Sequence, residues 1–205
     1  MKTAITAAAI LLAGATMANA ADLQGRGSQG MKDAAGVSVS WEGPYIGAQA
    51  GYGDFGDSEK SAEGGTGGAT LGYRLQRGSL VFGPYASVNW STSSIKFPGD
   101  EEGDAGGKVE KGIGWSAGGE AGWLLSKDVL GYVKVGYTQN FYNEKRDGGT
   151  NTFRLDGVEF GGGAEVNVGP GISIGAEYLR REMSEEGVSE NLGLVTAKYR
   201  FPVRN

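Results

Sequence analysis

Apolar and non-apolar positions alternate along this chain with the period of two that a β-strand imposes. Between residues 45 and 53, one face of the predicted strand is small or polar and the other is apolar. The apolar face consists of Ile46, Ala48, Ala50 and Tyr52. Seven later segments repeat this arrangement. The sequence therefore predicts eight strands, at residues 45–53, 65–75, 80–90, 113–123, 132–141, 157–168, 172–178 and 192–201.

The connections between these strands alternate in length. Residues 76–79, 126–128 and 169–171 form short turns, whereas residues 54–64, 91–111, 143–152 and 182–190 form longer polar stretches. Outer-membrane barrels have this asymmetry, with short periplasmic turns and longer extracellular loops. An even number of strands then places both ends of the chain on the periplasmic side.

Glycine and charge on the non-apolar face favour a barrel over a soluble two-sheet sandwich. This face carries charged residues in mid-strand, namely Glu120, Lys134, Glu159, Glu165, Glu177, Lys198 and Arg200. It is also rich in glycine, which weakens a water-exposed strand. Inside a narrow eight-stranded barrel glycine has a purpose, because large and small side chains must alternate to fill the interior. We therefore expect Tyr45, Tyr85 and Tyr132 to fill space that glycines leave on neighbouring strands.

The charges inside such a barrel need partners, since a lone buried charge is very costly. Glu120 and Lys134 lie at nearly equal distances from the turn around Lys127, which makes them expected cross-strand partners. Lys198 and Arg200 could balance Glu159, Glu165 and Glu177. Within the third strand Pro84 cannot donate to the ladder, and it predicts a bulge.

Aromatic residues favour a lipid-facing outer surface. We expect interfacial girdles on that surface from Tyr52, Tyr73, Trp90, Trp115, Trp123, Tyr137, Tyr178 and Tyr199. In a soluble sandwich the same aromatics would pack in a core.

The first twenty residues predict export. Lys2 supplies a positive charge, residues 7–15 are apolar, and Ala18-Asn19-Ala20 matches a small-residue cleavage site. Residues 1–20 are therefore predicted to be a signal peptide and not a membrane anchor, because their apolar core is short. Residues 21–40 show no periodicity, so we predict that they form a disordered periplasmic segment that leads into the barrel. Residues 41–205 are then the barrel.

Composition excludes several other classes of protein. Without Lys2 the chain has 18 basic against 24 acidic residues, a net charge of −6, which argues against nucleic-acid binding. No cysteine is present, so no disulfide stabilises the exported protein. No segment after the signal approaches about 20 apolar residues, so a membrane could be crossed only by a closed barrel.

The sequence offers little catalytic chemistry. It contains no histidine or cysteine, which removes the usual general base, the thiolate nucleophile and the commonest metal and haem ligands. We therefore expect no enzyme, no cofactor and no metal. The carboxylates of residues 100–104 could hold a divalent cation, although their spacing fits no calcium loop and a solvated acidic loop is favoured. The glycines at 161–163 precede no helix, so they form no phosphate cradle.

Basic residues in the predicted outer loops suggest a second kind of partner. Lys96, Lys108, Lys111, Lys145 and Arg146 could contact lipopolysaccharide phosphates, with plain solubility as the equal alternative.

The two ends of the barrel region carry a resemblance. Residues 41–53, W-E-G-P-Y-I-G-A-Q-A-G-Y-G, resemble the opening of small porin-family, OmpA-like barrels of proteobacterial outer membranes. Residues 194–201, L-V-T-A-K-Y-R-F, resemble their closing strand, which the barrel-assembly machinery reads. Family members usually end at the aromatic residue, whereas this chain continues with Pro202-Val203-Arg204-Asn205. No counterpart of the peptidoglycan-binding domain of OmpA proteins is expected.

The resemblance implies an all-β, eight-stranded antiparallel up-and-down barrel in the outer membrane. Its expected partners are outer-membrane lipids, lipopolysaccharide and the assembly machinery, and we expect a monomer. The expected function is non-enzymatic support of the envelope with display of surface loops, in roles such as adhesion or host contact. The alternative is a narrow pore or a conduit for a small ligand, which an interior packed with charges and tyrosines disfavours.

Overall fold

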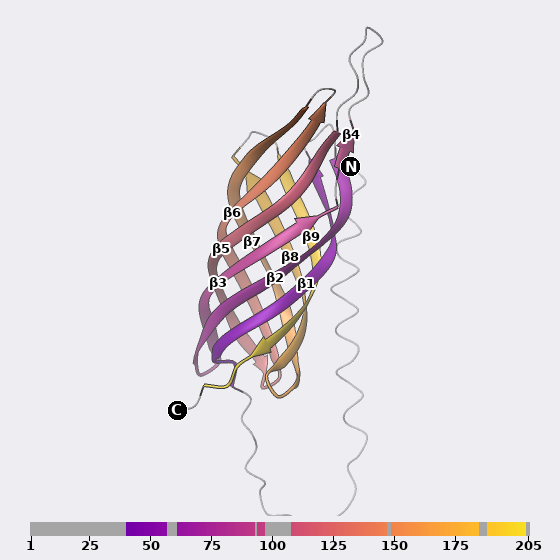
Figure 1. The fold of residues 1–205 in the computed structure, drawn as a ribbon. Helices are drawn as coiled ribbons and strands as arrows, with labels where there is room; N and C mark the ends of the chain where they lie inside the picture. Colours follow the sequence, from indigo (N-terminus) through magenta and orange to yellow (C-terminus); the bar gives the residue numbers. More distant parts are fainter. Residues whose placement is uncertain are drawn as a thin grey trace, which may run out of the picture. The chain divides into compact units, whose positions relative to one another are not determined.

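The computed structural model describes residues 40–56, 61–92, 94–96, 108–146, 149–184 and 188–203. They form nine strands, drawn in Figure 1. The strands are β1 (Gly43–Gly56), β2 (Ser61–Arg77), β3 (Leu80–Ser91), β4 (Ser94–Lys96), β5 (Lys108–Ser126), β6 (Val129–Arg146), β7 (Gly149–Gly169), β8 (Ile172–Met183) and β9 (Ser189–Arg200). No helix in these ranges is long and apolar enough to cross a membrane.

The strands close into one antiparallel barrel. Strands that follow each other in sequence pair with each other, except that β3 pairs with β5 rather than with the short β4. The barrel closes where β1 pairs with β9, from Tyr45 opposite Arg200 to Gly56 opposite Ser189. The short β4 pairs with the same strand, β5, as β3 does, and so continues β3 beyond Thr92. Because β4 continues β3, the barrel has eight strands around its circumference, which confirms the predicted fold class. Pairing of β1 with β9 closes the sheet on itself.

The described strands are longer than the sequence pattern predicted. Several segments that were expected in loops continue the hydrogen-bonded ladders instead. They are residues 61–64, 108–111, 143–146, 149–152, 182–183 and 189–190. A transmembrane strand needs only about 9–11 residues to cross the hydrocarbon. Beyond that band the outward face no longer has to be apolar, so the alternation disappears although the hydrogen bonds continue. The three short turns are confirmed, centred on residues 78–79, 127–128 and 170–171.

The outward face is the apolar one, as predicted. All eight aromatics expected in girdles are exposed on it. Tyr73, Trp123 and Tyr199 lie towards the end with the short turns, whereas Tyr52, Trp90 and Tyr178 lie towards the other end. Together with valine, leucine and isoleucine they form an apolar band between two aromatic levels, the arrangement of a barrel in a bilayer.

The described strands have register irregularities at three places, and Pro84 is not one of them. The partners of β3 keep one register through Pro84 on both sides, so the predicted bulge is wrong. The missing N–H of Pro84 instead leaves the pairs at Tyr73 and Arg74 unformed, without an inserted residue. The real irregularities lie between Lys111 and Gly114, between Leu124 and Ser126, and between Asn167 and Gly169.

Inside the barrel, tyrosines occupy the space beside glycines, as predicted. A Cβ added to Gly72 would lie 2.6 Å from the Tyr45 ring. At Gly136 it would lie 2.5 Å from the Tyr85 hydroxyl, and at Gly163 3.1 Å from the Tyr132 hydroxyl. Each tyrosine therefore depends on a missing side chain on another strand.

We predict that Gly72→Ala destabilises the barrel by about 1–3 kcal/mol, because its methyl group would overlap the Tyr45 ring in a packed interior. Gly169→Ala is the control, since nothing lies within 4 Å of a Cβ at that position. Urea unfolding in lipid vesicles measures both. Equal unfolding midpoints for the two variants would contradict the packing argument.

Candidate functional site

The lumen of the barrel is filled by a column of ion pairs. Among the described residues, five buried carboxylates and five buried cations pair along its length. The carboxylates are Glu120, Glu159, Glu165, Glu177 and Glu190, and the cations are Arg74, Lys111, Lys134, Arg181 and Lys198. A charge in a low-dielectric interior is tolerated only with close partners and hydrogen bonds, which this column supplies.

The inner layer, nearest the short turns, centres on Arg74. Its Nε donates to Glu120 Oε1 at 2.7 Å, and its Nη1 and Nη2 donate to the two oxygens of Glu165, each at 2.9 Å. Lys198 also contacts Glu165, and the Ser173 hydroxyl donates to it at 3.0 Å. One guanidinium thus joins carboxylates from two different strands.

The middle layer combines Lys134, Glu177 and the interior tyrosines. Lys134 Nζ lies 3.2 Å from Glu177 Oε1, and the Tyr132 hydroxyl donates to Glu177 Oε2 at 2.6 Å. Lys134 also lies 4.1 Å from the centre of the Tyr85 ring, close enough for a cation–π contact. The Tyr85 hydroxyl donates to Glu159 at 2.9 Å and so links this layer to the next.

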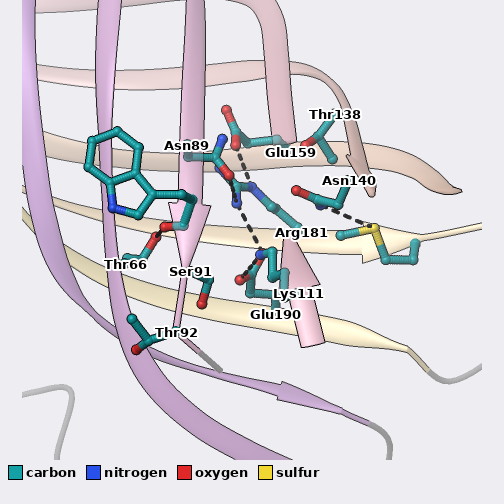
Figure 2. A network of polar contacts seen from close by, with 12 residues as sticks. Thr66, Asn89, Ser91, Thr92, Lys111, Thr138, Asn140, Glu159, Arg181 and Glu190 are labelled. Carbon is teal, nitrogen blue, oxygen red and sulfur yellow. Dashed lines mark hydrogen bonds and ion pairs between the residues drawn. The ribbon is translucent and has the colours of Figure 1, made fainter. Parts of the chain in front are cut away.

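The outer layer, shown in Figure 2, centres on Arg181. Arg181 Nε donates to Glu159 Oε2 at 2.7 Å, and Nη1 donates to Glu190 Oε2 at 3.0 Å. Lys111 Nζ contacts the other oxygen of Glu190. The Ser116 hydroxyl adds a bond to Glu159 at 3.1 Å.

Apolar clusters close the column at both ends. At the inner end Trp41 is fully buried and packs with Val81, Leu130 and Tyr132. At the outer end Phe55, Tyr142, Leu155 and Met183 form a second cluster. The rings of Phe55 and Tyr142 stack 5.2 Å apart, and those of Tyr142 and Phe153 stack 5.4 Å apart. We call this Phe55–Tyr142–Phe153 stack the aromatic lid.

Trp41 is held from two separate turns although it precedes β1. Its backbone N–H donates to Gln76 Oε1 at 2.7 Å, beside the first turn, and its indole N–H donates to the Lys127 carbonyl at 3.2 Å, in the second. The guanidinium of Arg200 lies 4.9 Å from its ring centre. The indole therefore spans the inner mouth of the lumen.

The ion pairs differ in part from those predicted. Glu120 and Lys134 are directly opposite each other, as expected, but Glu120 binds Arg74 and Lys134 binds Glu177. The predicted pairing is wrong because long side chains reach across the lumen to other strands. Lys198 balances Glu165 as predicted. Within the described residues Arg181 and Lys134 balance Glu159 and Glu177, while Arg200 lies over Trp41.

Lys111 is the largest departure from the prediction. It was expected in an outer loop, in contact with lipopolysaccharide or simply with solvent, yet it is buried in the lumen against Glu190. Between Gly114 and Lys111, β5 advances three residues while β6 advances two, so one extra residue is inserted. Such a bulge reverses the alternation, and it turns Lys111 inward. The side chains of Lys96, Lys108, Lys145 and Arg146, and all of residues 100–104, lie outside the described residues.

Comparison with known proteins establishes the family. The family model described as the outer membrane protein beta-barrel domain matches residues 6–201. The chain belongs to this family of outer-membrane barrels. No curated protein sequence matches it. The family and the outer-membrane location expected from the sequence are thus confirmed, and the column lies inside a membrane-spanning barrel.

Solved structures share the fold at low sequence identity. Neisserial surface protein A has a TM-score of 0.58 and 17% identity, covering 77% of this chain and 97% of its own. Ail, the attachment invasion locus protein of Yersinia pestis, has a TM-score of 0.54 and 17% identity, covering 78% and 99%. The outer membrane enzyme PagL is less similar, with a TM-score of 0.44, 12% identity and coverage of 77% and 99%. At these identities the likeness extends to the fold alone.

Other predicted features of this outer-membrane barrel fall at its ends. The signal peptide, residues 1–20, and the lead-in up to residue 39 lie outside the described residues. The residues after the closing strand, Phe201 to Val203, are exposed, and the Phe201 N–H donates to the Pro44 carbonyl at 2.9 Å. Reading of this end by the assembly machinery stays a prediction.

We predict that Arg181→Met destabilises the barrel by about 3–5 kcal/mol, because it leaves buried Glu159 without its cation and weakens the pairing of Glu190. The neighbouring Arg180→Met is the matched control. Arg180 points outward and pairs with Glu182 in solvent, so its loss should cost at most about 1 kcal/mol. Urea unfolding midpoints measure both, and a small effect of Arg181→Met would rule out the column as a stabilising element.

We also predict that Trp41 seals the inner mouth. The chain has no cysteine, so Val81→Cys places a single thiol in the inner cluster. A charged methanethiosulfonate should label this thiol slowly, and at least tenfold faster when Trp41→Ala is added. Trp123→Ala, on the outward face, should leave the labelling rate unchanged. Equal labelling rates in all three proteins would show that Trp41 does not block access to the inner end of the lumen.

Proposed function

We propose that this outer-membrane barrel is a non-enzymatic structural protein that supports the envelope and displays the connections at its outer end to the cell exterior. The observation that carries the proposal is the closed ionic column, bounded at each end by an apolar cluster. A lumen filled in this way by the described side chains argues against a continuous aqueous route, since an eight-stranded barrel is just wide enough for side chains to fill it.

The similar proteins support the display role. One is named a surface protein and another an attachment invasion locus protein. A rigid barrel suits such a role, because its strands fix the points at which the outer connections leave the barrel. Adhesion or host contact through these connections, and contact with lipopolysaccharide, are part of the proposal.

The absence of histidine and cysteine from the chain supports the non-enzymatic part. No group of three or more carboxylates in the described residues is arranged to hold a metal ion. The buried carboxylates of the column are bound to cations and hydroxyls, so they are poorly placed to exchange protons with a substrate.

Planar-bilayer recording tests the proposal against its alternative, a narrow pore. We expect no steady single-channel current from the refolded barrel, with a large porin in the same bilayers as the positive control. Altered gel migration before and after boiling would establish that the inserted protein is folded. Steady currents from protein that passes this check would replace the structural role with transport.

A deletion strain tests envelope support and loop display separately. Loss of the protein should increase detergent sensitivity, and a barrel with residues 97–107 replaced by glycine and serine should restore resistance. The same replacement should reduce surface adhesion if those residues act as a display segment. Unchanged detergent sensitivity in the deletion strain would contradict the envelope role.

A further inference from the structure

The outer half of the lumen contains several buried polar atoms that lack a hydrogen-bond partner. Within the described residues, five buried side-chain atoms make no hydrogen bond, and four of them lie in this half. These four are Asn89 Nδ2, Asn140 Oδ1, Tyr142 OH and Arg181 Nη2. Their side chains are at most 2% exposed. Buried polar atoms are nearly always paired with protein or with ordered water, so four such atoms in one half of the lumen point to a bound molecule.

Sheet register and a side-chain contact bring three of these groups, on Asn89, Asn140 and Arg181, to one place. Asn89 on β3 and Asn140 on β6 are both direct partners of Gly114 on β5. A Cβ at Gly114 would lie 3.0 Å from Asn89 Oδ1 and would overlap Asn140 Oδ1. The two amides therefore converge over a glycine. Arg181 reaches the same region, with Nη1 3.4 Å from Asn89 Oδ1 (Figure 2).

The charges around this region cancel. Lys111 and Arg181 provide two positive charges, and Glu159 and Glu190 provide two negative ones. Their ion pairs join all four groups, as Figure 2 shows. An ion entering the region would therefore add an unbalanced charge to a buried neutral set, which is costly.

The unpaired atoms need an occupant of mixed hydrogen-bonding character. Asn89 Nδ2 and Arg181 Nη2 are donors, whereas Asn140 Oδ1 is an acceptor and the Tyr142 hydroxyl is both. The Asn140 amide is oriented by its Nδ2, which faces Met183 Sδ at 4.0 Å. An anion would leave Asn140 Oδ1 unsatisfied, and a cation would leave both donors unsatisfied.

We propose that the outer half of the lumen is an internal binding site for a small uncharged molecule that both donates and accepts hydrogen bonds. The occupant is water or a solute of a few heavy atoms, such as a carboxamide. Tyr142 belongs both to this site and to the aromatic lid, so entry requires the Phe55–Tyr142–Phe153 stack to part. The occupant should therefore exchange slowly with bulk solvent.

NMR of the complete barrel in lipid nanodiscs, labelled with 15N-asparagine, tests this site. We expect water cross-peaks at the side-chain amides of Asn89 and Asn140, assigned by their loss in Asn89→Leu and Asn140→Leu. Acetamide, which donates and accepts, should shift these signals saturably if a solute can replace water. Acetate, which only accepts, should not. Water cross-peaks without an acetamide effect would identify water as the sole occupant and support the site.

Paired glycine variants of β5 make the test specific. Gly114→Ala should abolish the water cross-peaks and any acetamide shift, because its methyl group overlaps the Asn140 amide. Gly119→Ala faces outward, where the nearest atom to its Cβ is 3.9 Å away, and should change neither. If Gly114→Ala does not fold, the wild-type signals decide. Three results would overturn the proposal. The wild type could show no water cross-peaks and no acetamide shifts, acetate could cause shifts, or Gly114→Ala could give normal signals.

Discussion

The structure depends on one constraint, which is that the interior of an eight-stranded barrel is too narrow for bulk water and too polar to be left empty. Every inward side chain must be matched in volume and every charge must be paired inside the same narrow space. Arg74 illustrates the solution, since its planar guanidinium binds Glu120 and Glu165 at once and lies 4.7 Å from the centre of the Tyr45 ring. A lysine at this position could not make the same set of contacts.

The two apolar ends strengthen the ion pairs of the column and raise the free-energy cost of leaving any charge unpaired. By excluding water they lower the dielectric around the pairs, which strengthens each bond and raises the cost of a missing partner. Trp41 closes the inner end from outside the sheet, through bonds to Gln76 and Lys127. The aromatic lid closes the outer end from β1, β6 and β7. Barrel closure between β1 and β9 is thus reinforced by contacts that cross the lumen.

The sequence alone predicted the fold and six of the ten charged residues of the column, because both follow from strict alternation. The outward Ile46 and the inward Tyr45 follow from period two, and glycine on the inward face predicted the fit of Tyr45 to Gly72. Apart from Glu159, the charged residues of the outer layer could not be found in this way. Arg181 and Glu190 lie on parts of β8 and β9 beyond the apolar band, where the outward face is no longer apolar and the alternation signal fades.

The choice of partners could not be predicted, because it depends on the lumen as a whole. Register places Glu120 opposite Lys134, and in an open sheet that proximity would favour a pair. In a closed barrel Glu120 can also reach Arg74 on β2, two strands away across β3, and the bidentate guanidinium is the better partner. Lys134 is then free to bind Glu177 on β8. The position of Lys111 could not be predicted for a different reason. One inserted residue in β5 reverses the alternation, so that a lysine expected in an outer loop becomes a buried partner of Glu190.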